Sequence, residues 1–80
     1  MKIRAISTEK AIKLIETENT ITFNIDRKMH KPELKSELES MFNIKVQKIR
    51  THIMKGEKIA LVRLKKESSA PELATKLGLI

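Results

Sequence analysis

Residues 7–26 contain two hydrophobic patterns of different period. Apolar side chains recur at helical spacing up to Ile15, and charged side chains occupy the positions between them. From residue 20 onward the period is two, because Ile21, Phe23 and Ile25 alternate with polar residues. A one-sided helix that runs directly into a one-sided strand predicts that the two pack together. We therefore expect a layer of helices on a sheet.

Local start and stop signals delimit the first two predicted helices. Ser7 or Thr8 is placed to cap the first helix, and Asn19 to end it immediately before the strand. Pro32 fits the first turn of a second helix, which Asn43 ends. The alternating residues 1–6, before the first helix, predict a short strand at the edge of the sheet.

The second half of the chain predicts two strands and a last helix. Near Gln47 the apolar residues shift from one face of the predicted strand to the other, as a β-bulge would cause. The alternative is a strand with apolar residues on both faces. After a short turn at Gly56, residues 58–65 are apolar on both faces, which predicts a central strand covered on both sides. A capping box begins at Ser69, and Gly78 ends the final helix. The expected order of elements is β-α-β-α-β-β-α.

Eighty residues favour one domain, residues 1–80. A core of this size rarely supplies more than roughly 3–5 kcal/mol by itself. The sequence has no cysteine, which excludes a disulfide framework and thiolate zinc sites. It has no apolar run of bilayer length and no signal-peptide pattern. We expect a soluble, cytoplasmic protein without membrane insertion.

The net charge of +7 is concentrated in one segment. Residues 44–66 contain eight basic residues and one acidic residue, Glu57, so this segment carries the whole excess. The remaining nine basic and nine acidic residues cancel. A local excess of this kind indicates a polyanionic partner more than a general aid to solubility.

Catalytic signals are weak throughout the sequence. The two histidines, His30 and His52, stand in no metal-binding or catalytic-triad pattern. Two glycines are too few for a glycine-rich phosphate loop. We expect no catalytic residue, no metal and no cofactor, and His52 is interpreted as a strand residue close to RNA or solvent.

The composition restricts how the protein would bind nucleic acid. There is no Trp or Tyr, and both phenylalanines fall on predicted core faces, so stacking platforms for single-stranded bases are not expected. Lysine and arginine together with Thr, Asn and Gln suit the phosphates and 2′-hydroxyls of folded RNA. We interpret Lys13 and Lys76 as ordinary solvated charges.

The order of motifs resembles large-subunit ribosomal protein number twenty-three over nearly the whole chain. Each motif alone is weak, but their order and spacing together are fairly specific. The matching residues are Thr8-Glu9-Lys10-Ala11, Asn19-Thr20, Lys31-Pro32-Glu33-Leu34-Lys35, Met41-Phe42, Lys45-Val46, Lys48-Ile49 with Thr51, and Gly56 and Lys58 ahead of Ala60-Leu61-Val62-Arg63-Leu64.

The resemblance implies an α+β fold, a four-stranded antiparallel sheet with helices packed on it. It implies binding to large-subunit rRNA beside the exit of the peptide tunnel, among neighbouring large-subunit ribosomal proteins. It also implies a docking platform for signal recognition particle and nascent-chain chaperones, with Glu9 at the position where such factors dock. Bacterial members carry a long hairpin loop that reaches into the tunnel. Here that connection is only residues 54–57, which resembles the compact archaeal branch.

The leading hypothesis is a structural ribosomal protein that holds the rRNA backbone. The residues expected to contact RNA are Lys28, Lys31, Lys35, Lys48, Arg50, Thr51, Lys58 and Arg63. The alternative is a free-standing basic module that regulates or binds RNA or an acidic protein. A small enzyme on a ferredoxin-like scaffold ranks last, because no nucleophile–base constellation is present.

Overall fold

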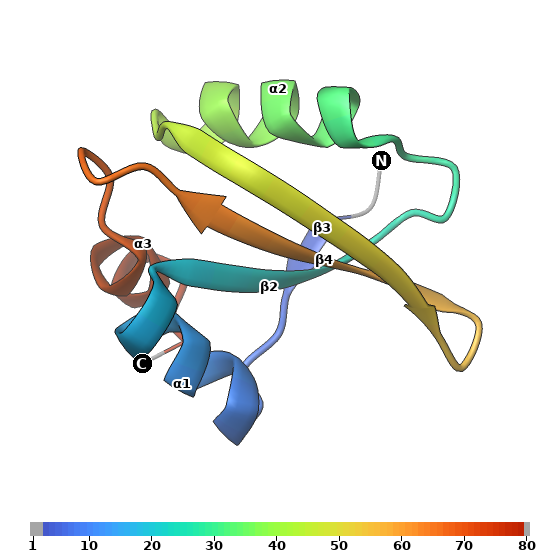
Figure 1. Cartoon of the computed structure of the whole chain (residues 1–80), viewed down its shortest axis with the longest axis horizontal. Helices are drawn as coiled ribbons and strands as arrows, with labels where there is room; N and C mark the ends of the chain where they lie inside the picture. The colour runs from blue at the N-terminus through green and yellow to red at the C-terminus, as the bar shows by residue number, and fades with distance from the viewer. Residues whose placement is uncertain (1–2, 80) are drawn as a thin grey trace.

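A computed structural model describes residues 3–79, which form four strands and three helices (Figure 1). They are β1 (Ile3–Ala5), α1 (Glu9–Glu18), β2 (Thr20–Ile25), α2 (Lys31–Phe42), β3 (Val46–Met54), β4 (Glu57–Leu64) and α3 (Ala70–Lys76). The predicted α+β class and element order are confirmed. Met1 and Lys2, which were included in the first predicted strand, lie outside the described residues.

The strands form an antiparallel sheet in the order β1-β2-β4-β3. β1 lies at one edge and β4 is central, as predicted. The last two strands are joined by a two-residue turn, because Met54 pairs with Glu57 across Lys55 and Gly56. Both turn residues have positive φ, 51° and 78°, which matches the primed turn that fits the twist of a hairpin.

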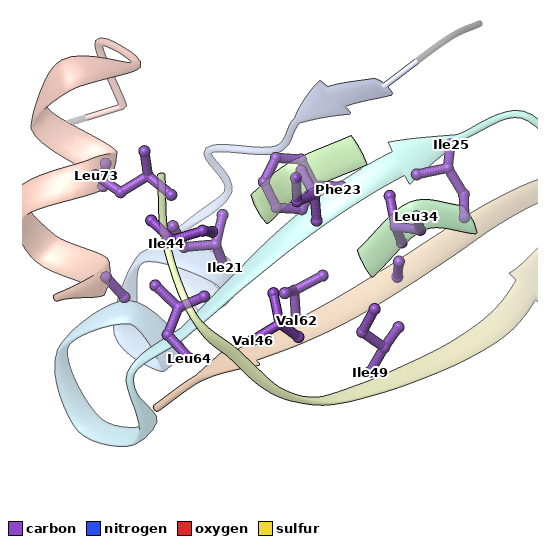
Figure 2. Packing of buried hydrophobic residues seen from close by; sticks show 14 of the residues in the cluster. Ile21, Phe23, Ile25, Leu34, Ile44, Val46, Ile49, Val62, Leu64 and Leu73 are labelled. Atoms are coloured by element: carbon purple, nitrogen blue, oxygen red, sulfur yellow. The ribbon is translucent and has the colours of Figure 1, made fainter. Parts of the chain in front are cut away.

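One face of the sheet carries the hydrophobic core. Ile21, Phe23 and Ile25 of β2 share this face with Val62 of β4, and all four side chains are buried. Leu34 on α2 belongs to the same cluster, as Figure 2 shows. Burial of these apolar surfaces is the main source of stability in so small a domain.

The helices begin and end where the sequence predicted. The Thr8 hydroxyl accepts a hydrogen bond from the N–H of Ala11 at 3.2 Å, and Asn19 ends α1 with a left-handed φ of 52°. At the end of α3, Gly78 donates to the carbonyl of Thr75 and Leu79 donates to Ala74. This pair of bonds is the Schellman arrangement, and the side chain of Leu79 packs on the core.

A register shift between Val46 and Lys48 interrupts the pairing of β3 with β4. Gln47 is the extra residue, so the predicted bulge is confirmed. Because of this shift, Val46 and Ile49 both face the core although they are three positions apart.

The second face of β4 is covered less than the sequence predicted. Ile59 and Leu61 point away from the core, and both are half-buried rather than enclosed. The reason is that α2 and α3 pack on the opposite face, where they join the core cluster. In Figure 1, α2 runs along the upper side of the sheet, whereas α1 and α3 lie together at the left-hand end of β2. We call the second face the open face.

Candidate nucleic-acid interface

Three of the predicted RNA-binding residues meet on the open face. Lys48 of β3 pairs directly with Arg63 of β4, and Arg50 pairs with Leu61 two positions further along. The side chains of Lys48, Arg50 and Arg63 therefore point to the same side, and all three are exposed. We call these three residues the open-face cluster.

The open-face cluster surrounds a shallow hollow of about 130 Å³, which Glu18, Thr20 and Leu61 also line. One carboxylate stands among three cationic groups, so the hollow keeps an excess of positive charge. The cationic side chains rise from paired strands whose backbones are fixed by the sheet. A fixed group of cations on a solvent-facing surface suits the phosphates of a folded nucleic acid.

The predicted lysines of the second connection and second helix lie on the other side of the sheet. Lys31 and Lys35 are one turn apart on the same flank of α2, and both are exposed. Lys28 is exposed in the turn that precedes α2, where its N–H donates to the Asp26 carboxylate at 3.0 Å. These three lysines lie on the α2 side of the sheet, among the carboxylates of Asp26, Glu33 and Glu37.

Lys58 and Thr51 also belong to the core side of the sheet. The Lys58 ammonium group donates to the carbonyl of Met29 at 2.6 Å, so it fastens the connection between β2 and α2. Thr51 pairs with Ala60 and is half-buried. The expected RNA-binding residues therefore divide between two sides of the sheet and do not form one surface.

Glu9, the predicted docking residue, is the first residue of α1 and is exposed. The Thr8 cap fixes the backbone immediately before it. A carboxylate in the first turn of a helix is also favoured by the helix dipole. Glu9 is thus presented on an ordered helix end.

The open face also contains residues that are not among the predicted RNA contacts. His52 is exposed and pairs with Ile59, which places it on the same side as Arg50. Thr20 and Leu61 line the hollow beside the open-face cluster. Alternation along β3 indicates the face of His52, but the contributions of β2 depend on the strand order, which a single sequence does not reveal.

Other kinds of site are not found among residues 3–79. No three His, Asp or Glu side chains in this part of the chain are grouped as metal ligands. Within the same range, no helix has the length and apolar character needed to cross a membrane.

Comparisons with known proteins agree with this geometry. Residues 1–74 match the family model described as ribosomal protein L23. The chain is 45% identical over 78 residues to large ribosomal subunit protein uL23 of Pyrobaculum aerophilum, covering 96% of both chains. It is 47% identical over 78 residues to the protein of the same name from Caldivirga maquilingensis, covering 96% of this chain and 91% of the relative.

Both relatives are archaeal and nearly the same length as this chain, which agrees with the short connection between β3 and β4. The match of the family model extends from the first residue into α3. The chain therefore belongs to the ribosomal protein L23 family, and it is a structural, non-enzymatic constituent of the large ribosomal subunit.

Proposed function

We propose that the chain binds large-subunit rRNA next to the polypeptide exit tunnel. The observation that carries this proposal is the open-face cluster, where the paired strands β3 and β4 hold Lys48, Arg50 and Arg63 together. Family membership supports an rRNA partner, and the absence of Trp and Tyr favours contacts to the RNA backbone.

The mechanism is electrostatic positioning. Each cationic side chain that neutralises a phosphate releases condensed counterions, so binding is favoured at low salt and weakens as salt rises. The sheet fixes the spacing of the cations and therefore the orientation of the protein on the RNA. Thr51 and Lys58, together with Lys28, Lys31 and Lys35, provide a second set of contacts from the other side of the sheet.

A salt titration tests the rRNA contact. Affinity for large-subunit rRNA from the same organism is measured against salt concentration for the wild type, Lys48→Ala and Arg50→Ala. Each substitution is expected to reduce the salt slope by roughly one unit, because one phosphate contact is lost. Lys76→Ala, which removes an exposed lysine from α3, is the matched control. Wild-type slopes for both test variants would remove these residues from the contact set and contradict the proposed function.

The same proposal gives α1 a role in protein docking. Glu9 lies exposed at the start of α1, so an ordered carboxylate is available to basic side chains of an incoming factor. The partners in this proposal are signal recognition particle and nascent-chain chaperones, with neighbouring large-subunit proteins beside the rRNA.

Charge reversal at Glu9 tests the docking role. Subunits that contain Glu9→Lys are expected to bind signal recognition particle more weakly in a sedimentation assay, since repulsion replaces attraction. Glu16→Lys, which makes the same change at an exposed position further along α1, is the control. Equal binding by both variants and the wild type would exclude Glu9 from the docking surface.

The alternative hypothesis, a free-standing basic module, predicts a different result from a sedimentation experiment. A tagged chain that co-sediments with large subunits at moderate salt supports the proposal. A chain that is stable and abundant but remains in the soluble fraction would support the module instead.

A further inference from the structure

A second hollow lies on the open face beside α1. Leu14 of α1 lines it together with Thr22 of β2, His52 of β3, and Ile59 and Leu61 of β4. We call this hollow the α1 groove. Its volume is about 260 Å³, which is below the roughly 300–1,000 Å³ of pockets that enclose a drug-sized ligand. The α1 groove suits one flat group better than a whole small molecule.

Thr22 is the one polar side chain in the described residues, 3–79, that is buried without a hydrogen-bond partner. Its side-chain oxygen is shielded from solvent and unpaired, and the residue is 7% exposed. Leaving a buried hydroxyl unpaired costs free energy. A 120° rotation about the Cα–Cβ bond moves the hydroxyl to the position that the methyl group now holds, while the methyl group moves to the position of the hydrogen. An occupant of the α1 groove with a polar edge would give this hydroxyl a partner.

The α1 groove is continuous with the open-face cluster. Leu61 lines both hollows, and the strand that carries Lys48 and Arg50 continues on the same face to His52. An RNA strand that runs along β3 from the cluster toward His52 would place its next nucleotides over the groove. The exposed imidazole of His52 stands at the groove's side, and histidine is one of the side chains on which unpaired bases stack.

We propose that the α1 groove binds one unstacked nucleobase of the RNA held by the open-face cluster. The base lies against Leu14, Ile59 and Leu61, stacks on His52, and hydrogen-bonds through its polar edge to the Thr22 hydroxyl. This inference rests on the proposed rRNA contact and adds to it a contact that distinguishes a base from the backbone.

Thr22→Val tests the base contact, because it keeps the shape of the side chain and removes only the hydroxyl. The free protein is expected to unfold at an equal or higher temperature, since no hydrogen bond is lost in it. Its dissociation constant for large-subunit rRNA from the same organism is expected to rise about two- to tenfold. The salt slope is expected to stay at the wild-type value, because no phosphate contact changes. Thr75→Val, the same change at an exposed site on α3, is the control.

A second variant keeps the test independent of folding. His52→Ala changes an exposed residue and is expected to weaken rRNA binding by about fivefold or more through lost stacking. Wild-type affinity of both Thr22→Val and His52→Ala, with a reduced salt slope for Lys48→Ala, would overturn the base site and leave the rRNA contact standing. Wild-type slopes for Lys48→Ala and Arg50→Ala would instead contradict the proposed function.

Crosslinking distinguishes the occupants of the α1 groove. Ultraviolet irradiation of intact large subunits is expected to join one rRNA base to the peptide that contains His52 or Leu61. Crosslinks from these residues to a neighbouring protein, without any to RNA, would show a protein occupant and would overturn the inference.

Discussion

Asn19 connects two distant parts of the fold through its backbone and its side chain together. Its backbone adopts the left-handed conformation that ends α1, with φ at 52°. Its amide nitrogen donates to the carbonyls of Leu64 and Ser68 at 3.1 and 3.0 Å, and its amide oxygen accepts from the N–H of Ala70 at 2.7 Å. Asparagine suits this position because it tolerates the left-handed region and has both a donor and an acceptor.

Asn19→Ala is expected to lower the free energy of unfolding by about 2–4 kcal/mol. Alanine is strained at this φ, and the partners of the amide lose their hydrogen bonds. Since the core of so small a domain rarely supplies more than roughly 3–5 kcal/mol, this loss leaves a substantially unfolded population. Urea denaturation followed by circular dichroism measures the change.

Asn19→Gly separates the two causes. Glycine relieves the backbone strain but lacks the amide, so we expect a smaller loss than for alanine. Equal stability of Asn19→Gly and the wild type would show that the side-chain hydrogen bonds contribute nothing.

The sequence predicted that Asn19 ends a helix, but it did not predict the hydrogen bonds that its side chain makes to distant residues. Its position before a strand indicated the end of a helix, which depends only on neighbouring residues. Its hydrogen bonds join residues 45 to 51 positions away, and no local pattern encodes them. The pairing of Thr22 against Leu61 was hidden for the same reason.

At the scale of elements, the turn between β3 and β4 contains backbone strain at Lys55 that a substitution can relieve. Lys55 has φ at 51°, a conformation that side chains other than Asn and Asp seldom adopt. Gly56 follows with φ at 78° and accepts this conformation freely. The turn therefore has the favoured residue at its second position only.

Lys55→Asn is expected to raise the free energy of unfolding by about 0.5–1 kcal/mol, because Asn-Gly is the preferred pair for this turn. Thermal denaturation measures the gain. Gly56→Ala is the opposing variant: an added Cβ meets no atom within 4 Å, so any loss of stability comes from backbone strain alone. A stabilised Gly56→Ala variant would contradict this account of the turn.

The elements themselves were predictable because their signals are local. Caps at Thr8 and Ser69 and the left-handed residue Asn43 set the helix ends, and alternation set the strands. The prediction that β4 is covered on both sides was wrong in degree, since Ile59 and Leu61 are only half-buried. Apolar character showed that these residues avoid water, but not that a groove would be left beside them.

At the scale of the molecule, the basic residues face two directions. The open-face cluster lies on one side of the sheet, and Lys28, Lys31 and Lys35 lie on the side of α2. The molecule measures 29 × 26 × 19 Å, so its thinnest dimension spans about two Debye lengths at 0.1 M salt. Exposed charges on the two sides therefore act almost independently of each other. In the proposed rRNA complex, the two sides would therefore contact separate segments of RNA.

Two triple variants test whether both sides bind rRNA. Replacing Lys48, Arg50 and Arg63 by alanine removes three charges from the open face, and replacing Lys28, Lys31 and Lys35 removes three from the α2 side. Each triple variant is expected to reduce the salt slope by about 2–3 units. The variant that combines all six substitutions is expected to reduce it by the sum of the two reductions. Because both variants lose the same charge, a difference between their slopes reports position and not net charge. A wild-type slope after the second replacement would confine the rRNA contact to the open face.

The bulge at Gln47 has a consequence for how this chain tolerates deletions. Val46 pairs with Leu64 and Lys48 with Arg63, so the strand on either side of Gln47 is already in phase. Loss of Gln47 would leave a regular strand with the same inward and outward side chains. Loss of Ile49 would instead reverse every later residue and turn Arg50 toward the apolar interior. Gln47 thus marks a position in β3 where a residue can be lost while the charged face and the apolar face of the strand keep their orientation.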